Sequence, residues 1–319
     1  MDTYECIHLS VGELLREERK RGDSQHAELI EECLVAGKIV PVEISLALVR
    51  SAMDRACLEG GVYGQPIFLV DGFPRNFDNL EGWTKVMPTA ASTLGALVYD
   101  CPIEVLERRI LGRAETSGRS DDNLESARKR FKTFQSQTMP VVHALEEVEK
   151  IQAKQSKDSI GMLHIQHIQG DGTVEEVWDN TKRAMNDFVK NDVLTGNAQL
   201  LRAISENNFD TYTKLCSREM LFEPGENTNE EYATSTPDDS QLRLSYERYE
   251  LSHGSGLKSF VVDAEVEVID GTKAVVTYER QLKNELGEIT THFKETRVWS
   301  HEPQGWLCIH FVRKPSSLS

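Results

Sequence analysis

The chain has 319 residues, with 52 Asp and Glu against 36 Lys and Arg, and a formal net charge of −16 at pH 7. A field of that sign repels nucleic acid and anionic membranes, which excludes both as partners and requires local arginines for any anionic ligand. At roughly 150 residues per domain, the length predicts two domains.

The cysteines are widely scattered and form no CxxC pair, which argues against a zinc site or a disulfide framework. They are Cys6, Cys33, Cys57, Cys101, Cys216 and Cys308. No apolar run approaches the ~20 residues of a membrane span, and the N-terminus lacks the apolar core of a signal peptide. These features predict a cytoplasmic protein, with the nucleus as the alternative compartment.

The first part of the chain alternates helical periodicity with short apolar runs. Ile67 to Val70 is fully apolar between Pro66 and Gly72, as expected of a strand buried in a parallel sheet. Further strands are expected at 96–99 and 162–168, and helices at 13–21, 27–34, 44–55, 103–113, 122–149 with a break near Pro140, and 174–189. This order predicts an α/β domain over residues 1–190.

The pattern changes after residues 191–196, whose polar and turn-forming composition predicts a linker. A second domain is expected over 197–315. It should begin with two short amphipathic helices between 200 and 216, followed by an acidic loop over 223–240 and strands at 259–269, 273–282, 288–299 and 306–313. Asp270-Gly271 between alternating runs indicates a hairpin, so we expect an antiparallel meander with helices on one face.

One group of polar residues follows the apolar run that ends at Val70. It reads Asp71-Gly72-Phe73-Pro74-Arg75-Asn76-Phe77-Asp78-Asn79. Open α/β sheets bind ligands at the carboxyl ends of their strands. Arg75 can hold a phosphate through two guanidinium nitrogens, and Asp71 can order a magnesium-bound water.

Three more segments carry candidate binding residues. They are His8 to Arg16, Gly37 to Pro41, and the arginine-rich region with Arg109, Arg113, Gly118 to Asn123 and Arg130. Each arginine alone is most simply a solvated surface group. Together they suit phosphoryl transfer, which needs positioning and charge neutralisation more than an acid or a base.

The motifs HLSVGELLREE, GKIVPVEIS, DGFPRNFDNLEGW and GRSDDNLESARKRF resemble the successive motifs of UMP/CMP kinases, within the adenylate-kinase family. The resemblance covers residues 1 to about 190. It implies ATP with Mg²⁺ as the phosphoryl donor, a pyrimidine monophosphate (CMP or UMP) as the acceptor, and no zinc subdomain in the lid.

The same resemblance implies roles for individual residues. The catalytic residues would be Arg75, Arg113, Arg119 and Arg130. The acceptor would be bound by Ser10, Arg16, Lys38, Val40, Asp71, Gly72 and Asn79, with Asn79 reading the base. Arg113 and Gly172 would contact ATP, Gly172 near the adenine. No side chain would bind the metal directly, Asp71 acting through a magnesium-bound water.

Members of that family begin with an apolar strand, a Gly-rich loop ending in Gly-Lys-Gly-Thr and a helix. The chain starts at Met1, where that helix would end, so the resemblance implies a P-loop kinase-like parallel sheet without its central strand and P-loop. Because that loop holds the ATP phosphates, we expect weak or no phosphoryl transfer from the chain as it stands. A truncated reading frame explains the retained arginines better than an evolved loss of the loop.

Residues 199–204, 209–216 and 222–224, with Glu295 to Trp299 and Trp306 to Phe311, resemble the association domain of calcium/calmodulin-dependent protein kinase II. The resemblance implies an α+β NTF2-like cone with an antiparallel sheet that forms homo-oligomers. Arg280 and Arg297 fall at its pocket positions, and the alternative is that they pair with acidic residues across strands. Trp299 and Trp306 are expected in the core.

Three functions follow from this sequence. The first is ATP-dependent phosphoryl transfer to CMP or UMP by an enzyme that oligomerises through its C-terminal domain. The second is a nucleotide-binding or assembly scaffold without catalysis. The third, an active site inside the cone, lacks an evident acid and base. The expected partners are small nucleotides and further copies of the chain.

Overall fold

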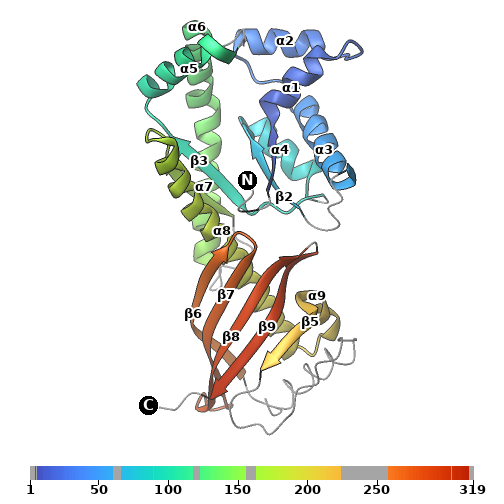
Figure 1. Ribbon diagram of the computed structural model, residues 1–319, viewed down its shortest axis with the longest axis vertical. Coiled ribbons are helices and arrows are strands. Elements are labelled where there is room, and N and C mark those ends of the chain that lie inside the picture. The colour runs from blue at the N-terminus through green and yellow to red at the C-terminus, as the bar shows by residue number, and fades with distance from the viewer. Residues whose placement is uncertain are drawn as a thin grey trace. The chain divides into compact units, whose positions relative to one another are not determined.

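The computed structural model describes residues 4, 6–59, 66–88, 90–117, 123–155, 163–223, 258–302 and 304–315. The chain divides into two compact units (Figure 1). Unit 1 contains most of residues 1–185, and unit 2 contains most of residues 186–319. In the described part of the chain, no helix combines the length and the apolar character that crossing a membrane requires.

Unit 1 alternates helices and strands as the sequence predicts. Its strands are β1 (Cys6–Ser10), β2 (Ile67–Asp71), β3 (Gly95–Asp100) and β4 (His164–Gln169). Its helices are α1 (Val11–Lys20), α2 (Ala27–Ala36), α3 (Val42–Glu59), α4 (Phe77–Val86), α5 (Ile103–Ser117), α6 (Leu124–Thr133), the π-helix η1 (Phe134–Thr138), α7 (Met139–Gln155) and the first part of α8 (Val174–Ser205).

The predicted parallel pairing is confirmed, in two separate pairs. Strand β1 pairs with β2, and β3 pairs with β4, both in parallel. The apolar run Ile67 to Val70 is half-buried rather than fully buried. This follows because β2 has one neighbouring strand within the described part of the chain, so its second edge is not covered by another strand there.

The main core of unit 1 lies where α1, α2 and α3 meet β1. Ile30 of α2 and Val49 of α3 are both completely buried there, and Leu15 of α1 is 4% exposed. Helix α4 approaches α3 closely because Gly82 has no side chain, and a Cβ at this position would lie 2.7 Å from Cγ2 of Val42. This packing fixes the start of α4, next to the end of β2.

The helix break expected near Pro140 is wrong. Helices α6 and α7 are joined without interruption through η1, in which the Met139 N–H bonds to the Phe134 carbonyl. Proline lacks an N–H and crowds the carbonyl four residues earlier, and a widened π turn just before it accommodates both effects.

Residues 191–196, expected to be a linker, are also helical, because α8 continues through them to Ser205. Thr195 donates its hydroxyl proton to the Asn191 carbonyl at 2.8 Å within the helix. Gly196 is needed for packing rather than for a turn, since a Cβ there would lie 3.2 Å from the ring of Trp299. The prediction from polar composition alone therefore ended this helix too early.

Unit 2 consists of the rest of α8, a short helix and a five-stranded sheet. The elements are α9 (Phe209–Leu215), β5 (Cys216–Glu223), β6 (Lys258–Asp270), β7 (Lys273–Lys283), β8 (Ile289–Glu302) and β9 (Gly305–Pro315). The sheet order is β5-β9-β8-β7-β6.

The expected antiparallel meander is confirmed for β6 to β9, including the hairpin at Asp270. The strand β5 was not expected, and it pairs with β9 in parallel. The acidic loop predicted at 223–240 lies outside the described residues from 224 onward.

The core of unit 2 lies on the sheet face that meets α8. Alternate residues of β7, from Ala274 to Leu282, are buried. Trp299 is completely buried and Trp306 is 8% exposed, which confirms both as core residues. Trp306 also donates a hydrogen bond to Asp192 of α8, whose pKa is raised by burial.

Candidate functional site

The candidate site of unit 1 forms where β1 and β2 end. Ser10 and Asp71 are the last residues of these strands and are paired in the parallel register. Gly72 follows with φ +73°, a conformation that glycine adopts without strain, and the chain turns there toward α4. Asn76 then caps α4 by accepting a hydrogen bond from the Asn79 N–H at 2.9 Å.

Arg75 lies in this turn, and its backbone and side chain are both anchored. Its N–H donates to Oδ1 of Asn79 at 3.1 Å, and its Nε donates to the Gly72 carbonyl at 2.7 Å. A Cβ on Gly72 would lie 2.6 Å from Nη2 of Arg75, so a larger residue at this position would displace the guanidinium. The guanidinium is therefore held in place from the turn itself.

Two further arginines act electrostatically on Arg75. The pKa of Arg75 is lowered, first by its removal from water and then by the charge of Arg130, with a smaller contribution from Arg16. Asp71 opposes the shift. Arg16 comes from α1 and Arg130 from α6. Three cations from three segments are thus close enough to act on one another, and their role in binding phosphate remains a prediction.

Asn79 lies in the first turn of α4 and is 2% exposed. Its Oδ1 accepts from Arg75, while its Nδ2 has no hydrogen-bond partner among the residues that the structure describes. A buried donor in this state costs stability unless a ligand or water accepts from it.

The loop between α2 and α3 contacts the helix that carries Arg130. Gly37 ends α2 with φ +66°, and a Cβ there would lie 3.1 Å from Cβ of Lys129. The Lys38 N–H donates to the Cys33 carbonyl at 2.9 Å, its side chain is exposed, and Val40 is 4% exposed. The segment predicted to form the base pocket thus lies next to α6, the helix that carries Arg130, and its backbone makes the contact.

The residues predicted to contact ATP lie around α5 and the start of α8. Arg109 donates from Nη1 to the Gly170 carbonyl at 2.5 Å and from Nη2 to the Gly172 carbonyl at 2.9 Å. Arg113 lies one turn further along α5 and is exposed. Arg119 lies outside the described residues. The roles predicted for Arg113, Arg119 and Gly172 remain predictions.

In unit 2, Arg280 and Arg297 are each 1% exposed and surround a buried carboxylate. Nη1 of Arg280 and Nη2 of Arg297 both lie 3.8 Å from a carboxylate oxygen of Glu295. Nη2 of Arg313 lies 2.8 Å from Oε1 of the same carboxylate. The expected alternative, pairing with an acidic residue across strands, is therefore observed for Arg280 on β7, whereas Arg297 lies on β8 together with Glu295. The pocket role of both arginines stays a prediction.

Glu295 is ionised in this cluster. Burial by itself would raise its pKa, but the charges of Arg313, Arg280 and Arg297 outweigh burial and hold the pKa below its usual value. The Tyr278 hydroxyl donates to Oε2 of Glu295 at 2.7 Å and accepts from Nε of Arg297 at 2.9 Å. Burial lowers the pKa of Arg280 to about 9, which leaves it charged at neutral pH.

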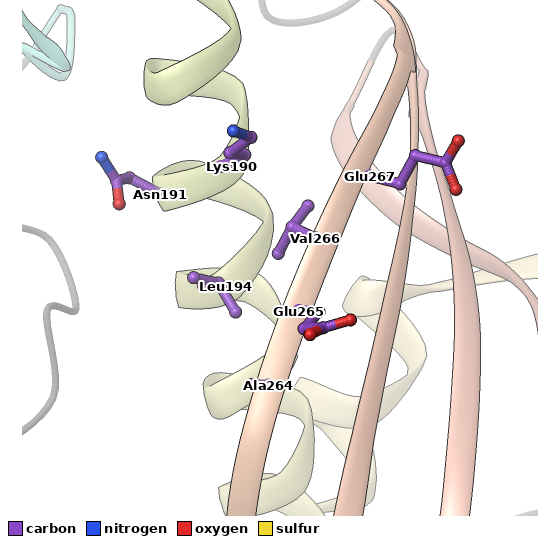
Figure 2. Close-up of a pocket in the computed structure, with 7 residues that line it drawn as sticks. All are labelled: Lys190, Asn191, Leu194, Ala264, Glu265, Val266 and Glu267. Carbon is purple, nitrogen blue, oxygen red and sulfur yellow. The ribbon is translucent and has the colours of Figure 1, made fainter.

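A groove of about 490 Å³ lies elsewhere in unit 2, between α8 and β6 (Figure 2). Its lining residues are Lys190, Asn191, Leu194, Ala264, Glu265, Val266 and Glu267. None of them belongs to a site predicted from the sequence. In Figure 2 the side chain of Glu267 points away from the helix, and the groove gathers no convergent set of charged groups.

Sequence reasoning missed two threonines that contact the site of unit 1. Thr138 donates to the Arg75 carbonyl at 2.8 Å, and Thr133 donates to the Gly37 carbonyl at 3.1 Å. Threonine is a poor residue for a helix interior, and that was the available signal. It also missed Glu295 and Tyr278, which read as ordinary strand residues.

Comparisons with known proteins agree with this division. The adenylate kinase family model matches residues 1–150, and the calcium/calmodulin dependent protein kinase II association domain model matches residues 189–317. The UMP-CMP kinases of Sus scrofa and Homo sapiens are 47% and 46% identical over 179 residues, 56% of this chain and 83% of each relative. A solved association domain of C. elegans CaMKII is 24% identical, with 42% of this chain and 98% of that one covered. The TM-score of this match is 0.32.

Proposed function

Because the chain belongs to the adenylate kinase family, with UMP-CMP kinases among its relatives, we propose that unit 1 binds CMP or UMP as the acceptor of a phosphoryl group from ATP. The convergence of Arg16 and Arg130 on Arg75 carries this proposal. Cations that repel one another in a half-buried site gain stability when a dianion joins them.

The arginines supply the chemistry that this reaction needs. A monophosphate is already ionised near neutral pH, so its oxygen attacks without a side chain acting as base. Catalysis then depends on holding the two reacting groups in line and neutralising their charge. Arg75, oriented by Gly72 and Asn79, is the guanidinium whose position the turn fixes most completely.

Asn79 supports a pyrimidine base as the group next to that phosphate. Its buried Nδ2 is a donor, and the carbonyl oxygen or ring nitrogen of a pyrimidine is an acceptor. Val40 provides a buried apolar surface, and the backbone of the Gly37 to Val40 segment provides further polar groups. The arrangement does not by itself distinguish CMP from UMP.

On the donor side, we infer that ATP contacts Arg113 and the backbone at Gly172, with Arg119 as a further lid arginine. Among the described residues no cluster of three or more His, Cys, Asp or Glu side chains is placed to hold a metal ion. Mg²⁺ would therefore enter with ATP, and the exposed carboxylate of Asp71 would contact its water shell. The metal would neutralise phosphate charge when bound.

For unit 2 we propose assembly into homo-oligomers, based on the match to the association domain. Size-exclusion chromatography with light scattering tests this directly. A monomer at micromolar concentration would contradict it.

The acceptor proposal is tested by isothermal titration calorimetry with CMP, UMP, AMP and GMP, followed by a coupled assay with ATP and Mg²⁺. We expect CMP or UMP to bind at least about tenfold more tightly than the purine monophosphates. Equal binding of all four would contradict a pyrimidine site. Tight pyrimidine binding without transfer would support the acceptor site and contradict phosphoryl transfer by this chain.

A further inference from the structure

The helical segment formed by α6, η1 and α7 touches both loops of the acceptor site through hydroxyl groups. Thr133 closes α6, and Thr138 closes η1. Each donates a hydrogen bond to a backbone carbonyl far away in sequence, Thr133 to Gly37 and Thr138 to Arg75. The same segment carries Arg130, which acts electrostatically on Arg75.

Thr138 completes the set of bonds that holds Arg75. The Arg75 N–H donates to Asn79 and its Nε donates to the Gly72 carbonyl, so the remaining polar backbone group of the residue is its carbonyl. That carbonyl accepts from Thr138 Oγ1 at 2.8 Å. The bond ties the turn that carries Arg75 to the helix that carries Arg130.

Thr133 does the same for the second loop. The Gly37 carbonyl accepts a hydrogen bond from Thr133 Oγ1 at 3.1 Å. Gly37 itself packs closely against the side chain of Lys129. Gly37 begins the segment whose backbone and Val40 form the proposed base pocket. Both halves of the acceptor site are therefore attached to one helical segment.

The π-helix explains how Thr133 and Thr138, which are five positions apart, can both bond to loops of the proposed acceptor site. In an α-helix, with 3.6 residues per turn, residues five apart are rotated by about 140°. A π turn bonds each residue to the fifth one before it, as Met139 bonds to Phe134, and brings such residues closer to a common face. Single π turns occur often at functional sites.

We propose that Thr138 and Thr133 are positioning residues of the acceptor site, which set Arg75 and the Gly37 loop relative to Arg130 before the nucleotide binds. The proposal rests on the proposed binding of CMP or UMP. The two hydroxyls would hold the site in its binding conformation before the ligand arrives. Their removal should therefore weaken the binding of a ligand that needs the aligned guanidiniums.

The test compares Thr138→Val, which keeps the shape and removes the hydroxyl, with Thr138→Ser, which keeps the hydroxyl. Calorimetry with CMP and with cytidine, which lacks the phosphate, measures each variant. We expect Thr138→Val to raise the Kd for CMP about five- to tenfold, the size of one neutral hydrogen bond, with a much smaller effect on cytidine. Thr138→Ser should stay within about twofold of the wild type.

Thr84→Val is the matched control, because Thr84 is exposed on α4 and its hydroxyl donates to the Glu81 carbonyl of the same helix. It should leave the CMP affinity unchanged. Thr133→Val provides a second, independent variant. It is expected to weaken the binding of CMP and of cytidine alike through the base pocket, with an unchanged melting temperature, which separates this loss from general damage. If the melting temperature of Thr138→Val shows that this variant does not fold, the affinities of Thr133→Val test the proposal instead.

The outcomes separate the two proposals. If the wild type binds neither CMP nor UMP, the proposed function fails and the positioning role fails with it. If the wild type binds CMP and both valine variants bind it equally well, the positioning role alone is overturned. An equal loss of CMP and cytidine in Thr138→Val would also overturn it, since that pattern indicates general damage rather than a displaced Arg75.

Discussion

Both units contain a group of three arginines, and the two groups have opposite surroundings. In unit 1, Arg75 is half-buried, and the charges that act on it are two arginines and the exposed Asp71. In unit 2, Arg280 and Arg297 are almost fully buried, and both lie near the completely buried carboxylate of Glu295. In the first group two of the charges that act on Arg75 are cationic, whereas the second group surrounds a completely buried carboxylate.

A third cluster, in unit 1, has one basic side chain and two carboxylates instead of several arginines around one carboxylate. His167 on β4 lies between two carboxylates, with Nδ1 2.7 Å from Asp100 and Nε2 2.9 Å from Glu146. The comparison teaches that residue type does not decide function here. The arginines of unit 2 surround a buried carboxylate, whereas the acidic neighbours of Arg16 and Arg75, Glu13 and Asp71, are exposed.

The largest expected effect comes from removing the central carboxylate of unit 2. Glu295→Gln should lower the free energy of unfolding by about 3–5 kcal/mol, because it leaves three guanidiniums together without their shared anion. Urea unfolding followed by tryptophan fluorescence measures it. Glu267→Gln, on the exposed edge strand β6, is the control and should change stability by less than about 0.5 kcal/mol. A loss below 1 kcal/mol for Glu295→Gln would erase the distinction between the two groups.

The next effect should appear in ligand binding rather than stability. Arg75→Lys keeps the charge but removes the fork and the bond to Gly72, so the Kd for CMP should rise about 10- to 100-fold. Arg50→Lys, an exposed arginine of α3 paired with Asp54, should leave it unchanged. Loss of stability without loss of affinity in Arg75→Lys would mean that this group, too, is structural.

A smaller change sharpens the comparison inside unit 2. Tyr278→Phe removes the hydroxyl that links Glu295 to Arg297, and it should destabilise the fold by about 1–3 kcal/mol. Chemical unfolding at pH 7 measures this loss. The effect should nearly vanish in a Glu295→Gln background, since the hydroxyl then has no ionised acceptor; full additivity of the two changes would contradict a shared network.

The smallest effect is expected from His167. Its hydrogen bond to Asp100, reinforced by Glu146, raises the pKa of the imidazole above the unfolded value of 6.5. A raised pKa stabilises the fold fully below about pH 6.5, and this stability is lost as the pH rises through the folded pKa. Because the side chain is 42% exposed, we expect the loss to stay well under about 1 kcal/mol.

Thermal unfolding of the wild type and of His167→Gln between pH 5.5 and 8.5 checks this sign. The wild type should lose melting temperature with rising pH relative to His167→Gln. His143→Gln, an exposed histidine of α7, should follow the wild type. A pH profile of His167→Gln that parallels the wild type would show that Asp100 and Glu146 do not stabilise the charged imidazole of His167.

Much of the fold could be predicted because its signals are local. The apolar run at β2, the alternation along β7 and the turn at Asp270 each lie within a few residues, and all three elements formed where expected. The predictions that failed concern continuity and pairing. Pro140 did not end its helix, residues 191–196 did not leave α8, and β5 became visible only through its pairing with β9.

The sequence by itself determined the two kinds of unit, most of the order of their elements and the arginine motifs of the proposed acceptor site. Periodicity and turn chemistry act between near neighbours, so a single sequence carries them. Only the tertiary structure decided which arginines already have a carboxylate, that Thr138 supports Arg75, and that Asn79 keeps a buried donor. Those properties depend on which distant segments lie side by side, and burial and charge partners are set by that arrangement.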